Sequence, residues 1–206
     1  MKKFIGLLIL GFIISQSLAA QSLVTAELQK NSSLSIIGST NLLSFKLSQN
    51  GEKLSRKKLT IATTQSQNKF FLSQNQLSVV VKNFTSNNPI ALNEFLQMIK
   101  SDVYPTLQFQ IDYVDTPPIS NKEHAYEGTA LVSITITGIT RHYSFPISFS
   151  SNGGLYAVDG KKRMSIRDFG LNPKSKMMGL IKVSEWIDVD FHMVYKISTD
   201  GDIVKL

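Results

Sequence analysis

Residues 129–149, TALVSITITGITRHYSFPISF, decide the fold class, because apolar and polar side chains alternate on both sides of Gly138. The first half places four apolar side chains on one face, namely Ala130, Val132, Ile134 and Ile136. The second half does the same with Tyr143, Phe145, Ile147 and Phe149. An alternation of period two is typical of a half-buried strand. We expect two strands joined by a turn at residues 138–141.

The same alternation recurs along most of the chain. It is found at residues 34–36, 43–47, 77–81, 107–113 (Leu107, Phe109, Ile111 and Tyr113 on one face) and 187–197. Many strands with short turns and few helices indicate an all-β protein, an antiparallel barrel or a sandwich. Periodicity does not separate these two, but a barrel of about eight strands can hold one small apolar ligand.

One stretch has helical spacing instead. Asn88 can cap a helix, Pro89 suits its first position, and apolar residues recur at helical intervals from Ile90 to Lys100. A second short helix is expected near residues 173–180.

The first residues have the three parts of a secretory signal: a basic start, an apolar run at residues 4–14, and small residues before Gln21. The run is too short to span a bilayer, which takes about 20 residues. We expect a signal peptide at residues 1–20, a single domain at residues 21–206, and a mature chain in the periplasm or outside the cell. A membrane anchor that is never cut is the alternative.

Composition excludes several kinds of chemistry. The chain has no cysteine, so thiol catalysis, cysteine metal sites and a lipid attached to a cysteine are excluded. Its formal charge of +7 falls to +5 without Lys2 and Lys3. The basic clusters at residues 56–58 and 161–163 lack the interleaved aromatics that stack on bases. We therefore expect no nucleic-acid partner, and a transient contact with an anionic membrane surface stays open.

No pattern indicates catalysis or a cofactor. Residues 168–170, Asp-Phe-Gly, match a kinase tripeptide without its companion motifs, so a tight bend with Phe169 in the core is expected. Asp188, Asp190 and His192 share one strand face, but side chains two residues apart stand roughly 7 Å apart and converge poorly on one metal. We expect no enzyme, no metal and no cofactor other than a bound lipid.

Aromatic and flexible side chains are candidates for the lining of an apolar pore. From alternation and aromatic content, the predicted ligand contacts are Phe45, Phe84, Phe109, Ile134, Phe145, Phe149, Phe169, Met177, Met178 and Phe191. For each one, a packed core is the competing interpretation.

Four stretches together resemble the YceI-like family. They are residues 37–45 (IGSTNLLSF), 104–109 (YPTLQF), 128–147 (GTALVSITITGITRHYSFPI) and 164–173 (MSIRDFGLNP), the last followed by Val189-Asp190-Phe191. They are similar in order and spacing to the family's opening strand, its Tyr-Pro motif after a helix, its Gly-x-Thr-Arg hairpin and its Asp-Phe-Gly run. The chain departs from many relatives at Leu43, Ser44 and Phe45, where those carry His, Asp and Trp, so no role of that histidine is carried over.

The resemblance implies a lipocalin-like antiparallel barrel of about eight strands with one or two short helices. It also implies binding of a polyisoprenoid or other long-chain lipid in an apolar pore, without catalysis. Two alternatives stay open: an envelope interaction module with a filled barrel, and a hydrolase or isomerase that acts on a lipid. Apolar residues on both strand faces, as at Leu131 and Val132, leave a homodimer open.

Overall fold

The computed structural model describes residues 22–54, 58–66, 68–115, 125–173, 175–176 and 180–199. The long strands in the second half of the chain are β7 (Thr106–Asp115), β8 (Ala125–Ile136), β9 (Ile139–Asn152), β10 (Leu155–Ser165) and β13 (Trp186–Thr199). The shorter strands are β1 (Ser22–Leu28), β2 (Ser33–Ser39), β3 (Ser44–Asn50), β4 (Lys58–Ser66), β5 (Lys69–Ser73), β6 (Leu77–Val80), β11 (Ser175–Lys176) and β12 (Ile181–Lys182). One α-helix, α1 (Pro89–Met98), and two short 3₁₀ turns, η1 (Val81–Asn83) and η2 (Ile166–Phe169), complete the described elements.

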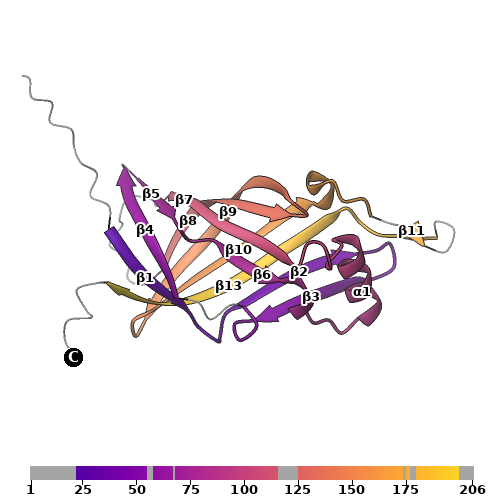
Figure 1. Ribbon diagram of the computed structural model, residues 1–206, viewed down its shortest axis with the longest axis horizontal. Helices are drawn as coiled ribbons and strands as arrows, with labels where there is room; N and C mark the ends of the chain where they lie inside the picture. Colours follow the sequence, from indigo (N-terminus) through magenta and orange to yellow (C-terminus); the bar gives the residue numbers. More distant parts are fainter. Residues whose placement is uncertain are drawn as a thin grey trace, which may run out of the picture.

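Eight strands close into a ring. Their order is β1-β4-β5-β7-β8-β9-β10-β13, and β13 pairs back with β1, every pair being antiparallel. The strands run at a steep tilt along an elongated barrel (Figure 1). The structure therefore confirms the antiparallel barrel of about eight strands, and the sandwich alternative is wrong.

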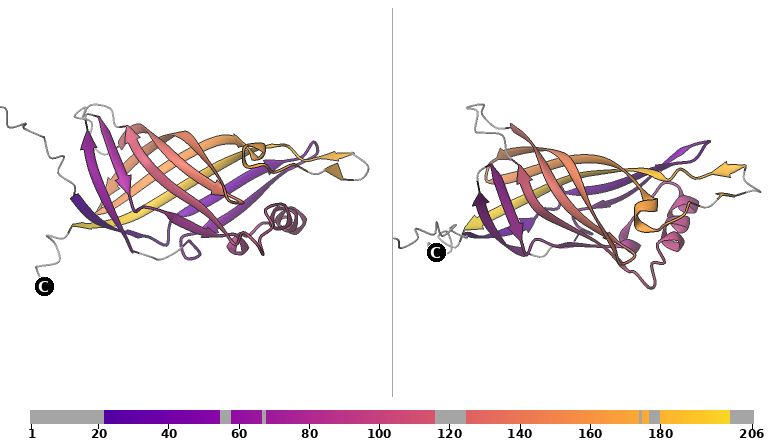
Figure 2. Two further views of the ribbon diagram at one scale, coloured as in Figure 1. Left: turned by 45° about the horizontal axis from the view of Figure 1, so that its top comes forward. Right: turned by 90° about the horizontal axis from the view of Figure 1, so that it is seen from above.

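Different strands complete the barrel wall at its two ends. One edge of β13 pairs with β1 over residues 195–199 and with β2 over residues 188–192. Similarly, β7 pairs with β5 over residues 113–115 and with β6 over residues 106–109. The wall is thus completed by β1, β4 and β5 at one end and by β2, β3 and β6 at the other, where α1 also lies (Figures 1 and 2).

The segment after β6 fastens β3 to the rest of the wall. Ser48 and Thr85 form a β-bridge, and the Gln49 side-chain Nε2 donates to the Val80 carbonyl at 2.7 Å. These bonds satisfy backbone groups that a strand edge would otherwise leave open.

The predicted alternation holds in β8 and fails midway along β7. Ala130, Val132, Ile134 and Ile136 are all buried in the core. In β7, Ile111 is opposite Val132 and Tyr113 is opposite Leu131, so Asp112 is an extra residue in a β-bulge. Because the bulge reverses the alternation, Val114 is buried and Tyr113 is not. The expectation that Tyr113 shares the inner face with Leu107 was wrong.

Two local predictions need correction. The β8–β9 turn lies at Thr137 and Gly138, with φ of 50° and 79°, and β9 already begins at Ile139. Positive φ at both central residues is the requirement of a two-residue type I′ hairpin, which fixes this register. The second expected helix, near residues 173–180, is also wrong in its described part, because Ser175–Lys176 is a strand that pairs with β12.

Other local predictions are confirmed. The Asn88 side chain caps α1 by accepting from the Ala91 backbone N–H at 3.0 Å, and Pro89 stands at its first position. Phe169 is buried at the end of η2, and Gly170 has the left-handed conformation with φ of 68°. Within the described residues, no helix is long and apolar enough to cross a membrane.

Candidate functional site

An apolar cavity of about 270 Å³ lies at the α1 end of the barrel. Its floor is formed by side chains from β2, β3, β7 and the end of β8, among them Ile36, Leu47, Leu107 and Ile136. Its roof is α1, and its side is closed by the segments that follow η2 and β12.

Phe45 takes its place in the lining because of Gly38 on the neighbouring strand. The two residues are cross-strand partners in the β2–β3 hairpin. A Cβ atom on Gly38 would stand 2.5 Å from Phe45 Cζ, so only glycine lets the ring lie flat across β2. Residues 37–45 of the sequence thus supply both the ring and the space for it.

The roof is only half packed. Phe95 of α1 meets Phe84 edge-to-face with ring centroids 5.5 Å apart, which anchors the helix to the core. No residue of α1 is fully buried, although Leu92, Phe95 and Leu96 pack against the core. The helix therefore covers the cavity without being locked into the barrel interior.

The lining is almost entirely apolar. Its polar members among the described residues are Thr40, Asn88, Glu94 and Ser184. Small-molecule sites commonly combine such an apolar surface with a few polar groups. The cavity suits a ligand that is mostly hydrocarbon.

The ten residues predicted to contact a ligand divide between the cavity lining, the packed core and the residues outside the described structure. Phe45 lines the cavity. Four others, Phe84, Ile134, Phe145 and Phe169, are buried in the packed core. Phe109, Phe149 and Phe191 are partly buried and pack against that core, and Met177 and Met178 lie outside the described residues. For the seven described residues other than Phe45, the structure shows a position in or against the core, and their role in binding stays a prediction.

Reasoning from the sequence missed the helical part of the lining. Ile90, Ala91 and Phe95 line the cavity from α1, yet no residue of the expected helix was among the predicted ligand contacts. Its apolar spacing was the available signal, since a helix with an apolar face must cover something.

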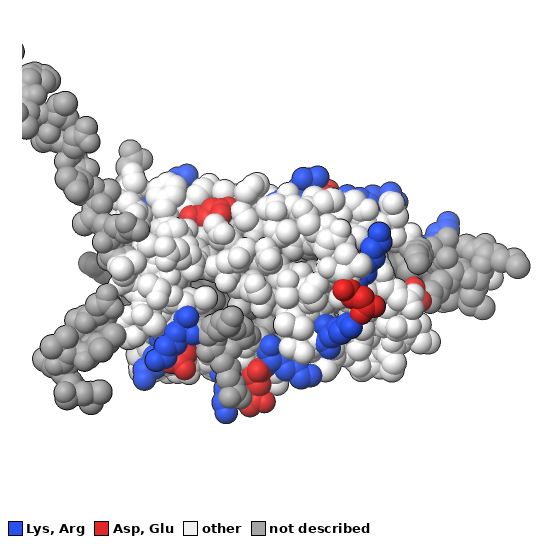
Figure 3. Space-filling view, in the orientation of Figure 1, with Lys and Arg blue, Asp and Glu red and all other residues white. Residues whose placement is uncertain are grey.

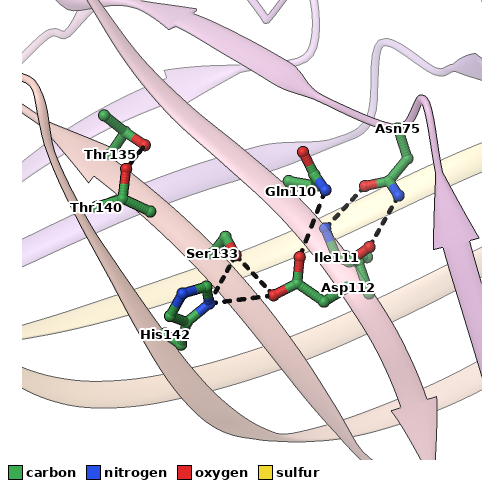
Figure 4. Close-up of polar contacts among 8 residues, drawn as sticks. All are labelled: Asn75, Gln110, Ile111, Asp112, Ser133, Thr135, Thr140 and His142. Atoms are coloured by element: carbon green, nitrogen blue, oxygen red, sulfur yellow. Dashed lines mark hydrogen bonds and ion pairs between the residues drawn. The ribbon is translucent and has the colours of Figure 1, made fainter.

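A polar cluster lies on the outer face of β7, β8 and β9 (Figure 4). The Ser133 hydroxyl donates to Asp112 Oδ2 at 2.6 Å, and His142 Nδ1 lies 2.8 Å from Ser133 Oγ and 3.3 Å from Asp112 Oδ2. In a catalytic triad the serine and the carboxylate face different ring nitrogens of the histidine. Here both face Nδ1, so this cluster lacks the geometry that activates a serine.

Other candidate polar groups also face away from the cavity or are engaged. His192 Nδ1 lies 2.6 Å from Asp159 Oδ1 across the β10–β13 pair. The Tyr143 hydroxyl donates to Asp168 Oδ2 at 2.7 Å, and burial, together with that carboxylate, raises the pKa of Tyr143. Among the residues that the structure describes, no three His, Asp or Glu side chains are grouped as metal ligands.

Solved structures share this fold at low sequence identity. The structure of Burkholderia cenocepacia BcnA aligns with a TM-score of 0.53 and 16% identity, covering 79% of this chain and 95% of that one. A Saccharophagus degradans domain, described as a polyisoprenoid binding domain implicated in plant cell wall breakdown, aligns with a TM-score of 0.56 and 10% identity, covering 84% and 98%. No curated protein matches the chain in sequence.

The family assignment rests on the sequence itself. The sequence model of the YceI-like domain matches residues 18–195, which is most of the chain and includes seven strands of the ring and most of β13. Together with the barrel, this match places all four motifs of the sequence within one domain. The chain belongs to the YceI-like family.

Proposed function

We propose that this chain is an exported, non-catalytic protein that binds a polyisoprenoid or another long-chain lipid. The cavity under α1 carries the proposal, because its lining is apolar and it is open to ligand at the end of a closed barrel. Each buried methylene contributes about 0.8 kcal/mol, so a hydrocarbon chain can bind with few polar contacts.

The size of the cavity bears on how such a lipid would sit. At about 270 Å³ it is near the lower end of known small-molecule sites. Part of a long chain would occupy it, and the remainder would extend past the mouth or enter by displacing α1. The half-packed attachment of α1 supports the second route.

The fold neighbours add support for the ligand class. The Saccharophagus degradans domain is described as binding polyisoprenoids, and it shares the barrel over 84% of this chain. The absence of triad geometry at Ser133 and His142 supports binding without catalysis.

Export is part of the same proposal. Residues 1–20 have the composition of a cleaved signal peptide, and without cysteine no lipid can be attached at the cleavage point. The mature chain would then carry its ligand through the periplasm or outside the cell. Mass spectrometry of the protein recovered from a bacterial envelope should give an N-terminus at Gln21 or Ala20.

The experiment that tests binding is native mass spectrometry of the mature protein purified from a bacterial host. The wild type should carry a co-purified lipid that organic solvent extracts. Ala91→Trp should abolish this adduct because the indole fills the cavity, whereas Asn93→Trp, on the exposed side of the same helix, should keep it. A bare polypeptide mass for the wild type would contradict the proposal.

A filled-barrel interaction module is the second candidate. Its supporting observation is that Ile134, Phe145 and Phe169 are buried in the packed core and none of them lines the cavity. This candidate predicts no adduct in any variant, so the same measurement separates the two.

Apolar side chains on both faces of β8 also support a homodimer, which light scattering after size exclusion would detect.

A further inference from the structure

We propose that the mouth of the cavity docks on an anionic lipid bilayer through an apolar rim made of Leu42, Leu43, Ile90 and Leu180. The inference deepens the proposed function and rests on it, because it names the surface from which the lipid would enter. It assigns the rim to the membrane and the barrel to the water phase.

The rim is unusually exposed for residues of its kind. The exposed fractions are 69% for Leu42, 51% for Leu43, 70% for Ile90 and 72% for Leu180. A single exposed leucine needs no explanation, but a group of them that adjoins an apolar cavity indicates an interaction surface. Leu42, Leu43 and Ile90 are themselves part of the cavity lining, so the exposed surface continues into the interior.

Asn41 holds two hairpins together at this rim. Its side chain donates to the Leu180 carbonyl at 3.0 Å and accepts from the Lys182 backbone N–H at 2.9 Å. The Asn41 backbone N–H also donates to the Lys182 carbonyl at 3.1 Å. Leu180 is therefore fixed beside the β2–β3 turn that carries Leu42, and the rim is a built edge of the molecule.

The charges beside the rim favour an anionic surface. Lys46 on β3 and Lys182 on β12 are exposed, and within the described part of the chain neither forms an ion pair. Glu185, in the segment that follows β12, is paired with Arg167, which offsets its charge. Juxtamembrane lysines are attracted to anionic lipids over about one Debye length.

Charge alone would not direct the molecule to a bilayer. On the face shown in Figure 3, lysine and arginine side chains are scattered along the edges among uncharged residues, with no large patch of one sign. Apolar insertion and a few flanking cations together are the combination that holds a protein at the lipid interface. A lipid can then move between bilayer and cavity without exposing its chain to water.

The test is flotation of the mature protein with vesicles of phosphatidylcholine, with and without phosphatidylglycerol. Wild-type protein should float with the anionic vesicles. Leu180→Ser should weaken this binding several-fold, and K46Q/K182Q should weaken it roughly tenfold or more, about the contribution expected from two lysines near the surface. Neither Leu180, Lys46 nor Lys182 lines the cavity, so native mass spectrometry should still find the co-purified lipid in both variants.

Matched controls come from surfaces away from the rim. Leu23→Ser removes a 48% exposed leucine from β1, at the opposite end of the barrel (Figure 1). K53Q/K196Q removes two exposed lysines for which the structure describes no ion pair. Both controls should float like the wild type.

Three outcomes would overturn the inference: no flotation of the wild type, equal losses in rim and control variants, or a wild-type dimer that Leu180→Ser dissociates while flotation is absent. If the wild type carries a lipid but does not float, only the rim inference fails. If the wild type floats but carries no lipid, the proposed function fails and the docking of the rim on the bilayer stands.

Discussion

At the scale of single residues, Gly160 makes room for the ring of Phe191. It is the cross-strand partner of Phe191, whose ring also lies 5.7 Å from the ring of Phe145. A Cβ on Gly160 would stand 2.5 Å from Phe191 Cζ and 3.1 Å from Ile147 Cγ2. Overpacking of this kind costs about 1–3 kcal/mol.

Gly160→Ala should therefore lower the free energy of unfolding by about 1–3 kcal/mol in urea titrations. In the Phe191→Leu background, Gly160→Ala should lower the free energy of unfolding by less, because the ring that the new methyl group meets is gone. If G160A is as destabilising in the Phe191→Leu background as in the wild type, the clash is not the cause.

Tyr195 gives the stability a dependence on alkaline pH. Burial raises the pKa of Tyr195 to about 12, from about 10 in an unfolded chain. Between these values the folded protein keeps a proton that the unfolded chain releases, so unfolding becomes easier as pH rises. The contribution is complete below about pH 10 and is lost as pH rises through about 12.

Urea unfolding at several pH values should show this loss as a difference between the wild type and Tyr195→Phe. The difference in unfolding free energy should fall by up to about 3 kcal/mol over that window, since each pKa unit corresponds to about 1.4 kcal/mol. Comparison with the variant cancels other alkaline titrations, including that of Tyr143. Parallel pH profiles for the two proteins would rule out Tyr195 as the source.

At the scale of elements, α1 depends on its cap more than on its packing. Its residues are at most partly buried, and Asn88 Oδ1 satisfies the Ala91 N–H at the first turn. Loss of such a cap costs about 1 kcal/mol. Asn88→Ala should therefore speed amide hydrogen exchange in α1 while exchange in β8 and β9 stays unchanged, and Asn88→Asp should behave like the wild type. Equal exchange in α1 of all three proteins would contradict this.

The elements that the sequence predicted best are those in which one pattern runs without interruption. The alternation of Ala130, Val132, Ile134 and Ile136 has a single solution, because a slip of one residue would turn all four outward. In β7 the same reasoning failed after Ile111, since an extra residue at Asp112 is invisible in the pattern of apolar side chains. Val114 rather than Tyr113 then faces inward.

The candidate site was harder to predict for a physical reason. Phenylalanines were expected in the pore from alternation and aromatic content. An aromatic side chain suits a core and a ligand site equally, so composition does not separate the two uses. The separation depends on which part of the barrel α1 covers, and that is a tertiary property. Phe45 lines the cavity whereas Phe145 fills the core, although both alternate in their strands in the same way.

At the scale of the whole molecule, the barrel has a packed end and an end that contains the cavity under α1. The long strands β8, β9, β10 and β13 run through both, while β2, β3 and α1 belong to the cavity end. Local stability varies within a protein, and segments that admit ligands have the lower values. Ligand binding should therefore stabilise the two ends unequally.

Removal of the co-purified lipid by solvent extraction and refolding should expose this difference. We expect a lower Tm, because a ligand that binds only the folded state adds RT ln(1 + [L]/Kd) to its stability. Hydrogen exchange should rise in α1 and in β3, next to the cavity, and much less in β8 and β9. Ala91→Trp, whose indole occupies the cavity, should lose little on the same treatment. A uniform rise in exchange along the barrel, or an equal fall in Tm for Ala91→Trp, would show that the lipid is bound elsewhere on the molecule.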